Sequence, residues 1–151
     1  MTQLIRTNSD NSDFRALVVQ LDRYLAIMDG EEHAFYDQYN KVAAIKQVVV
    51  ANKEGKAVGC GAIKAFSNEA AEVKRMYVHP DFRGQGIAKQ ILDELEKWAA
   101  KLGYSECILE TGIRQTEAVN LYQNFGYLLM DNYGPYENVT NSICMKKVLP
   151  Q

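Results

Sequence analysis

The sequence is poor in the residues that build covalent or metal cross-links. Its 151 residues include 3 cysteines and 2 histidines, with no Cys-x-x-Cys pair and no His/Cys cluster. An odd cysteine count without such spacing argues against a disulfide framework or a structural zinc site, so we expect no metal. Cys60 and Cys107 lie inside apolar runs, where a buried, reduced thiol is the ordinary interpretation. This cysteine usage favours the cytoplasm.

Long apolar runs and clustered basic charge are also absent. No stretch approaches the roughly 20 apolar residues that a membrane span needs. The polar start, MTQLIRTNSDNSD, does not resemble a signal peptide. The chain carries 17 basic and 19 acidic residues, without the basic excess that marks nucleic-acid binding. We therefore expect neither a membrane nor a nucleic acid as partner.

The chain does contain enough apolar sequence for a self-sufficient core. Hydrophobic residues make up 47 % of it, and a domain of this length buries roughly two thirds of the surface that its unfolded chain exposes. Since the sequence shows no linker and no internal repeat, we expect residues 1–151 to form a single domain.

The hydrophobic pattern predicts a mixture of strands and helices. Spacings of three and four indicate helices, and alternating or continuous apolar runs indicate strands. The predicted order is strand, two helices, three strands, helix, strand, helix and two strands, which is an α+β (mixed α/β) fold. We expect strands at 2–6, 47–52, 57–66, 72–78, 107–111, 127–130 and 142–148, and helices from 9–12 to Gly30, at about 32–41, at 87–102 and at 118–125. The last strand is expected to be exposed and able to pair across a homodimer.

A glycine-rich turn joins the strand that ends at Val78 to the next helix. Pro80 stops the strand, and the helix is then opened by the segment Arg83-Gly84-Gln85-Gly86-Ile87-Ala88. The first N–H groups of a helix lack intrahelical partners, and glycine lets an anion approach the backbone closely. The turn therefore favours a phosphate or pyrophosphate, with Arg83 as a cation. The alternative is a tight connection whose glycines serve only backbone geometry.

Together with the strand before it and a later helix, this turn resembles the sequence pattern of the GNAT superfamily of acyl-CoA-dependent N-acetyltransferases. Three elements match in order over roughly residues 47–130: Tyr77-Val78-x-Pro80, Arg83-x-x-Gly86-x-Ala88 and Ala118-x-x-Leu121-Tyr122-x-x-x-Gly126-Tyr127. The resemblance implies a central mixed sheet that is splayed into a V, with helices on both faces and the co-substrate acetyl-CoA in the V. It also implies pantetheine contacts from the backbone of Met76, Tyr77 and Val78. The pyrophosphate would be bound by the amides of Arg83, Gly84, Gln85, Gly86, Ile87 and Ala88.

Acyl transfer from a thioester to an amine needs a base, donors for the developing oxyanion and an acid. Tyr122 matches the family's penultimate-helix pattern and is predicted to be the acid; a packed core tyrosine is the alternative. Glu110, on the same strand face as Ile108, is predicted to be the base. A Leu-Glu-x strand at the same interval before the tyrosine in the resembling branch that acetylates protein N-termini supports this choice. A solvent-facing carboxylate is the alternative reading of Glu110.

Other residues are further candidates for the base or for contacts with the cofactor. Glu72 and then His79 follow Glu110 as candidate bases, although a glutamate at a strand end is more often solvated. The resemblance places Asn120 within reach of the cofactor. Gln115 stands where many relatives have asparagine, and this departure weakens a cofactor contact there.

In folds of this family the acceptor site is usually built by the first two helices and the loop before the last strand. Here these are residues 24–39 and 132–138, whose aromatic rings can equally form a small auxiliary core. Lys74 or Arg75 can face the cleft and pair with a substrate carboxylate, or can cover the surface. Carboxylates that can receive an ammonium group are Asp22, Asp29, Glu31 and Glu32.

No peptide-binding insertion is evident, so we predict a small primary amine, such as an amino acid, as acceptor. No cysteine lies beside a histidine base, so direct attack in a ternary complex is expected rather than an acyl-enzyme. The alternatives are a protein N-terminal acetyltransferase and a non-catalytic acyl-CoA-binding domain.

Overall fold

The structure, a computed structural model, describes residues 2–30 and 44–150. The helix expected at about 32–41 lies outside the described residues. The strands are Thr2–Thr7 (β1), Gln47–Lys53 (β2), Lys56–Ala65 (β3), Ala70–Val78 (β4), Glu106–Gly112 (β5), Leu128–Met130 (β6) and Ser142–Val148 (β7). The helices are Ser12–Asp29 (α1), Ile87–Lys101 (α3) and Thr116–Asn124 (α4), with short 3₁₀ turns at Pro80–Phe82 and Gly134–Tyr136. The elements expected in these parts of the chain are thus confirmed, with small shifts at their ends.

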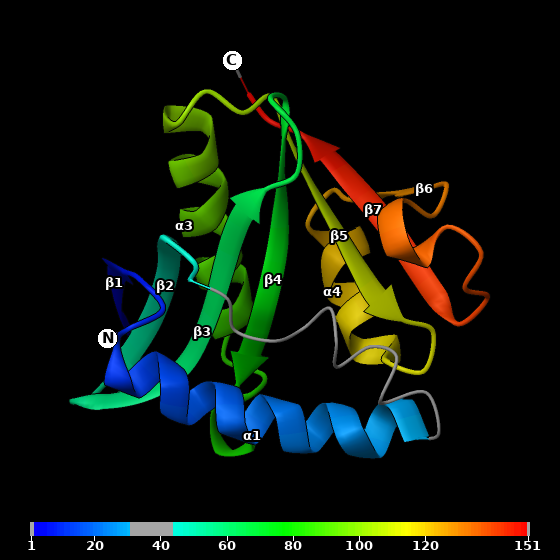
Figure 1. The fold of residues 1–151 in the computed structure, drawn as a ribbon. Helices are drawn as coiled ribbons and strands as arrows, with labels where there is room; N and C mark the ends of the chain where they lie inside the picture. Colours follow the sequence, from blue (N-terminus) through cyan, green and yellow to red (C-terminus); the bar gives the residue numbers. More distant parts are fainter. Residues whose placement is uncertain (1, 31–43, 151) are drawn as a thin grey trace.

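One seven-stranded sheet runs through the molecule in the order β1-β2-β3-β4-β5-β7-β6. Only β4 and β5 are parallel, and they pair over just three positions, from Ala70↔Glu106 to Glu72↔Ile108. Beyond these positions the two strands diverge (Figure 1), while β5 stays paired with β7 along its whole length. The splayed mixed sheet that the resemblance implied is confirmed.

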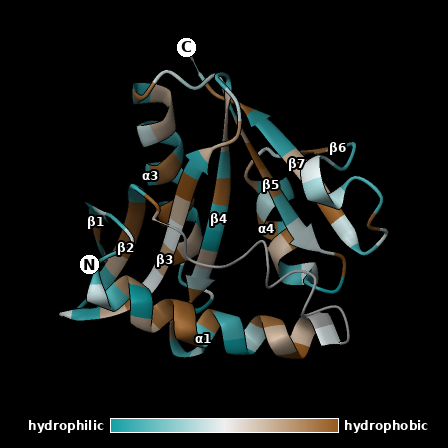
Figure 2. Ribbon diagram, in the orientation of Figure 1, coloured by the Kyte–Doolittle hydropathy of each residue, from teal (hydrophilic) through white to brown (hydrophobic). Residues whose placement is uncertain are grey.

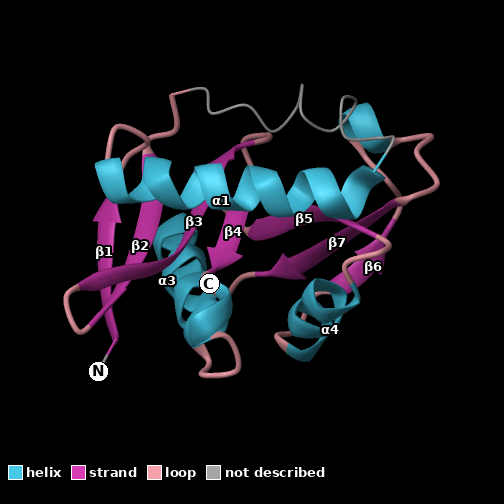
Figure 3. Ribbon diagram, turned by 90° about the horizontal axis from the view of Figure 1, so that it is seen from below, coloured by secondary structure: helices cyan, strands magenta, loops and turns pink. Residues whose placement is uncertain are grey.

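The helices cover both faces of this sheet. α1 crosses one face, and α3 and α4 lie against the other (Figure 3). Hydrophobic and hydrophilic stretches alternate along α1 (Figure 2), and its buried side chains pack on β2 and β3. The core between the sheet and α3 includes Val49, Ile63, Ile91 and Leu95. α1 and α4 therefore approach the splayed strands from opposite sides.

A bulge shapes β4 where it leaves β5. Cys60 pairs with Tyr77 and Ala62 with Lys74, so Arg75 and Met76 together face Gly61. Arg75 has a φ of 60°, a left-handed conformation that is uncommon for a residue with a side chain. A Cβ on Gly61 would lie 2.5 Å from the sulfur of Met76 and 2.9 Å from side-chain carbons of Ile91 and Leu95, so any larger residue opposite the bulge would displace these side chains.

The last strand, β7, is not an edge of the sheet. β7 lies inside the sheet, paired with β5 and, over Cys144 to Lys146, with β6. The expectation of an exposed last strand is wrong, because hydrophobic patterning does not encode the order of strands.

Within the described ranges, no helix has the length and hydropathy needed to cross a membrane.

Candidate active site

Two cavities adjoin where β4 and β5 part. The larger, of about 330 Å³, is lined from α1, β4, the glycine-rich turn, α3 and α4. The smaller, of about 90 Å³, is lined from α1, β4, β5, α4 and the loop that carries Tyr136. Leu21, Met76, Gln115 and Tyr122 line both cavities. A molecule in the larger cavity would therefore meet one in the smaller cavity beside these four residues.

The larger cavity has an open strand edge along one wall. β5 pairs with β4 no further than Glu72, so residues 73–78 have no strand partner on that side within the described chain. Met76, Tyr77 and Val78 all line the larger cavity. The edge therefore leaves backbone groups for an extended ligand arm to join as an added strand, as the resemblance implies for pantetheine.

The glycine-rich turn forms an open cradle at the start of α3. Gly84 and Gly86 both have a φ of 79°, and a Cβ on either would meet no atom within 4 Å. The N–H groups from Gly84 to Ala88 donate to no described residue. Unpaired N–H groups and the helix dipole suit a pyrophosphate, so the turn fits the anionic part of acetyl-CoA.

Arg83 is held at the mouth of this cradle. Its Nε donates a hydrogen bond to the Val78 carbonyl at 2.9 Å, and its guanidinium lies over the rings of Tyr24 and Tyr77 at 5.4 and 5.6 Å. Tyr24, expected on the acceptor side, thus lines the larger cavity instead. The side chain of Gln85 does not line the larger cavity; its oxygen accepts a hydrogen bond from Lys53.

Tyr122 projects from α4 to the junction of the two cavities and is only 7 % exposed. Its ring meets Tyr127 edge-on at 5.9 Å between centroids, and its hydroxyl makes no hydrogen bond with a described residue. Burial raises the pKa of Tyr122 above its ordinary value, and the negative charge of Glu110 raises that pKa further. The phenol therefore holds its proton at neutral pH, as an acid must before it acts.

Glu110 lies on β5 at the wall of the smaller cavity. It is half-buried, and its Oε2 accepts a hydrogen bond from Ser142 Oγ on β7 at 2.7 Å. Ser142 was not anticipated from the sequence, because the contact joins residues 32 positions apart across two strands. The serine orients the carboxylate that is predicted to be the base.

Glu72, the second candidate base, is 5 % exposed, so its reading as a solvated residue is wrong. The Tyr133 hydroxyl donates to Glu72 Oε2 at 2.7 Å, and Lys74 Nζ lies 3.9 Å from Oε1. Both Lys74 and Arg75 line the smaller cavity, so neither is a mere surface cation. Arg75, whose side chain is 4 % exposed, pairs with Asp22 at 2.7 Å.

The remaining candidates lie away from the cavities or outside the described residues. His79 lines neither cavity, and its Nδ1 accepts a hydrogen bond from the Asp81 N–H. Asn120 is exposed on α4 and also lines neither cavity, so its cofactor contact stays a prediction. Nothing is described of Glu31, Glu32 or the side chain of Asp29.

Comparison with known proteins agrees with this geometry. The family model described as "Acetyltransferase (GNAT) domain" matches residues 44–128. A protein of Azospirillum brasilense named "IAA acetyltransferase" is 36 % identical over 136 residues, which cover 88 % of each chain. A Klebsiella pneumoniae structure described as an acyl-CoA N-acyltransferase has a TM-score of 0.84 and 29 % identity, covering 99 % of this chain and 98 % of that one.

A structural neighbour shows the same fold with a ligand. A GNAT family acetyltransferase from Elizabethkingia anophelis, solved with acetyl-CoA bound, has a TM-score of 0.71 and 19 % identity over 98 % of each chain. The fold is thus one that this chain shares with acyl-CoA N-acyltransferase and acetyltransferase structures. The chain belongs to the GNAT acetyltransferase family, an enzyme family whose acyl donor is acetyl-CoA, as the motifs predicted.

Proposed function

We propose that this protein transfers the acetyl group of acetyl-CoA to the primary amine of a small molecule, by direct attack in a ternary complex. One observation carries the proposal: Tyr122 and Glu110 both line a small charged cavity, which adjoins a cavity with an open anion cradle. Acetyl-CoA supplies the acetyl group as a thioester.

The chain positions the donor with its backbone. The N–H groups at the start of α3 bind the diphosphate, and the open edge of β4 holds the extended arm beside Met76, Tyr77 and Val78. Backbone amides at this edge also polarise the acetyl carbonyl, because donors fixed in a partly buried site stabilise developing negative charge without reorganising.

Two side chains carry out the proton transfers. Glu110, oriented by Ser142, accepts a proton from the acceptor's ammonium group, directly or through a water. Tyr122 holds a proton at its hydroxyl oxygen and gives it to the sulfur as negative charge develops there. The raised pKa of Tyr122 keeps that proton in place until the C–S bond breaks.

The cysteines do not offer a covalent alternative. All three are buried, and burial raises the pKa of Cys60 and of Cys107 to about 12 and that of Cys144 to about 11. A thiol must be a thiolate to attack a thioester, and neither cavity is lined by cysteine. Direct attack by the amine is therefore the route that these residues support.

The size of the smaller cavity, about 90 Å³, favours a small acceptor over a peptide. The test follows free thiol released from acetyl-CoA with a panel of small amines and, in parallel, with peptides bearing free N-termini. Faster release with small amines supports the proposal. Faster release with peptides would favour a protein N-terminal acetyltransferase, and acetyl-CoA binding without release for any acceptor would indicate a non-catalytic domain.

A further inference from the structure

The two halves of α1 are held to the sheet in different ways. In the first half, Phe14, Leu17, Val18 and Leu21 are at most 5 % exposed and belong to a core shared with β2, β3 and β4. The second half carries half-buried and exposed side chains and passes the ends at which β4 and β5 diverge (Figure 1). Apolar burial therefore fixes the first half, and polar contacts become important for the position of the second.

An ion pair ties this second half to the bulge of β4. The Nη1 of Arg75 donates a hydrogen bond to Oδ1 of Asp22 at 2.7 Å. The Arg75 side chain is 4 % exposed, and its backbone is fixed in the left-handed bulge, where its carbonyl accepts a hydrogen bond from the Cys60 thiol at 3.4 Å. The pair thus joins the helix to a residue that has little freedom to move.

The neighbours of Asp22 on the helix form part of the cavity walls. Leu21 lines both cavities and Leu25 lines the smaller one, whereas Asp22 lines neither. The carboxylate of Asp22 therefore serves Arg75 rather than an ammonium group of the acceptor. Through this contact it sets how Leu21 and Leu25 lie over the place where the cavities adjoin.

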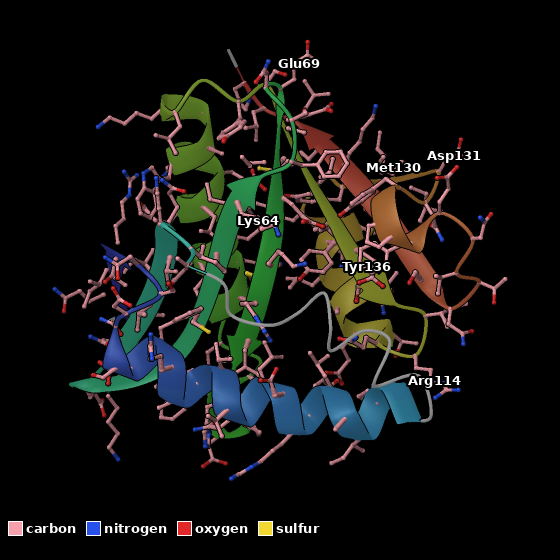
Figure 4. All side chains as sticks on the ribbon, viewed as in Figure 1. Lys64, Glu69, Arg114, Met130, Asp131 and Tyr136 are labelled. Carbon is pink, nitrogen blue, oxygen red and sulfur yellow. The ribbon has the colours of Figure 1, made fainter. Side chains whose placement is uncertain are left out.

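A second, weaker contact holds the end of α1. Arg114, in the loop between β5 and α4, lies beside the end of the helix in Figure 4, and its Nη1 donates to the Met28 carbonyl at 3.3 Å. Arg114 is exposed, and a single hydrogen bond in water contributes less than a nearly buried ion pair whose two members depend on each other. The pair of Asp22 and Arg75 is therefore the main polar contact of this half.

We propose that Asp22 is a positioning residue for the transfer reaction. Acting through Arg75, it holds the second half of α1 against β4, so that the wall of the smaller cavity fits the acceptor. The proposal rests on the proposed function and adds to it a residue that controls acceptor binding. Because a misplacement of about 1 Å can cost about 100-fold in rate, a small shift of α1 is enough to impair transfer.

The test measures thiol release with the fastest amine of the panel. Asp22→Asn removes the charge and keeps the size, and Asp22→Glu keeps the charge but lengthens the side chain by one methylene. Asp93→Asn is the matched control, because Asp93 pairs with Lys97 at 2.9 Å on the surface of α3 and lines neither cavity. Thermal unfolding and acetyl-CoA binding are measured for every variant.

We expect Asp22→Asn to raise the KM for the amine by about 10- to 100-fold, with acetyl-CoA binding almost unchanged because the glycine-rich turn and the β4 edge remain. A merely structural role would instead lower kcat through a smaller folded fraction and leave KM unchanged. Asp22→Glu should raise KM less, and Asp93→Asn should match the wild type. In an Arg75→Met background, Asp22→Asn should change kcat/KM little further, because the two residues act as one pair.

A wild-type KM for the amine in Asp22→Asn, or an equal loss of acetyl-CoA binding, would overturn the proposal. A full additional loss of kcat/KM in the Arg75→Met background would overturn it as well. If Asp22→Asn does not fold, Asp22→Glu decides by the same criterion of a raised or unchanged KM. These results leave the proposed function standing, whereas acetyl-CoA binding without turnover of any amine would overturn both.

Discussion

Replacing Tyr122 by phenylalanine removes one oxygen atom from the junction of the two cavities. The hydroxyl makes no hydrogen bond with a described residue, and the ring keeps its edge contact with Tyr127. Because no hydrogen bond with a described residue is lost and the ring is kept, the free energy of unfolding should change by no more than about 1 kcal/mol. Any larger effect of Tyr122→Phe on the enzyme must come from chemistry rather than from folding.

The effect on turnover should be large. A general acid contributes about 10²- to 10⁴-fold, which corresponds to about 3 to 5 kcal/mol of transition-state stabilisation. Because the diphosphate is held at the glycine-rich turn and the arm at β4, the Kd for acetyl-CoA should change little. We thus expect kcat to fall by at least about 100-fold while donor affinity is kept, as measured by thiol release and calorimetry.

Tyr127→Phe is the matched control. Tyr127 is 1 % exposed, and its hydroxyl donates to Glu96 Oε2 at 3.0 Å, where Lys147 also pairs with Glu96. Losing this buried bond should cost about 1–3 kcal/mol in chemical denaturation, with kcat nearly intact. Unchanged turnover in Tyr122→Phe, or a similar loss of turnover in both variants, would refute the role given to Tyr122.

Three other changes test separate parts of the structure. Glu110→Gln should lower kcat/KM and remove the acidic limb of its pH profile; a retained limb would move the base to Glu72, which lines the same cavity. Gly61→Ala should destabilise the protein by about 1–3 kcal/mol in urea unfolding, because its Cβ would crowd Met76 and the buried side chains of Ile91 and Leu95; an unchanged midpoint would contradict the close packing described. Burial lowers the pKa of Lys74 from 10.5, so the Lys74 amine binds a proton more tightly in the unfolded chain than in the folded one. The free energy of unfolding of the wild type should therefore rise relative to that of Lys74→Met as the pH rises toward 10.5. Parallel stability curves for the two proteins would refute that assignment.

The parts of the site that depend on local backbone were predictable from the sequence. A strand that stops at a proline and a glycine-rich turn that opens a helix are short-range features, and the structure places Gly86 and Ala88 as expected at the larger cavity. Helical spacing also sufficed to place Tyr122 on an amphipathic helix, because the side chain positions follow from the 3.6-residue period.

The contacts that tune the site were not predictable, because they join distant strands. The hydrogen bonds of Ser142 to Glu110 and of Tyr133 to Glu72 depend on the order of strands, which periodicity does not encode. Arg75 reaches Asp22 across 53 positions, from a bulge in which its own backbone is left-handed. No pattern of residue types marks such a position in advance.

The fate of the acetyl group tests the central claim most directly. With acetyl-CoA labelled in its acetyl carbon, mass spectrometry follows the label in the small amine and in the intact protein during a single turnover. The account predicts one labelled N-acetyl amine for each thiol released and no labelled protein at any time. A labelled protein that forms and decays before the product, or thiol release without a labelled amine, would contradict direct transfer to a small amine.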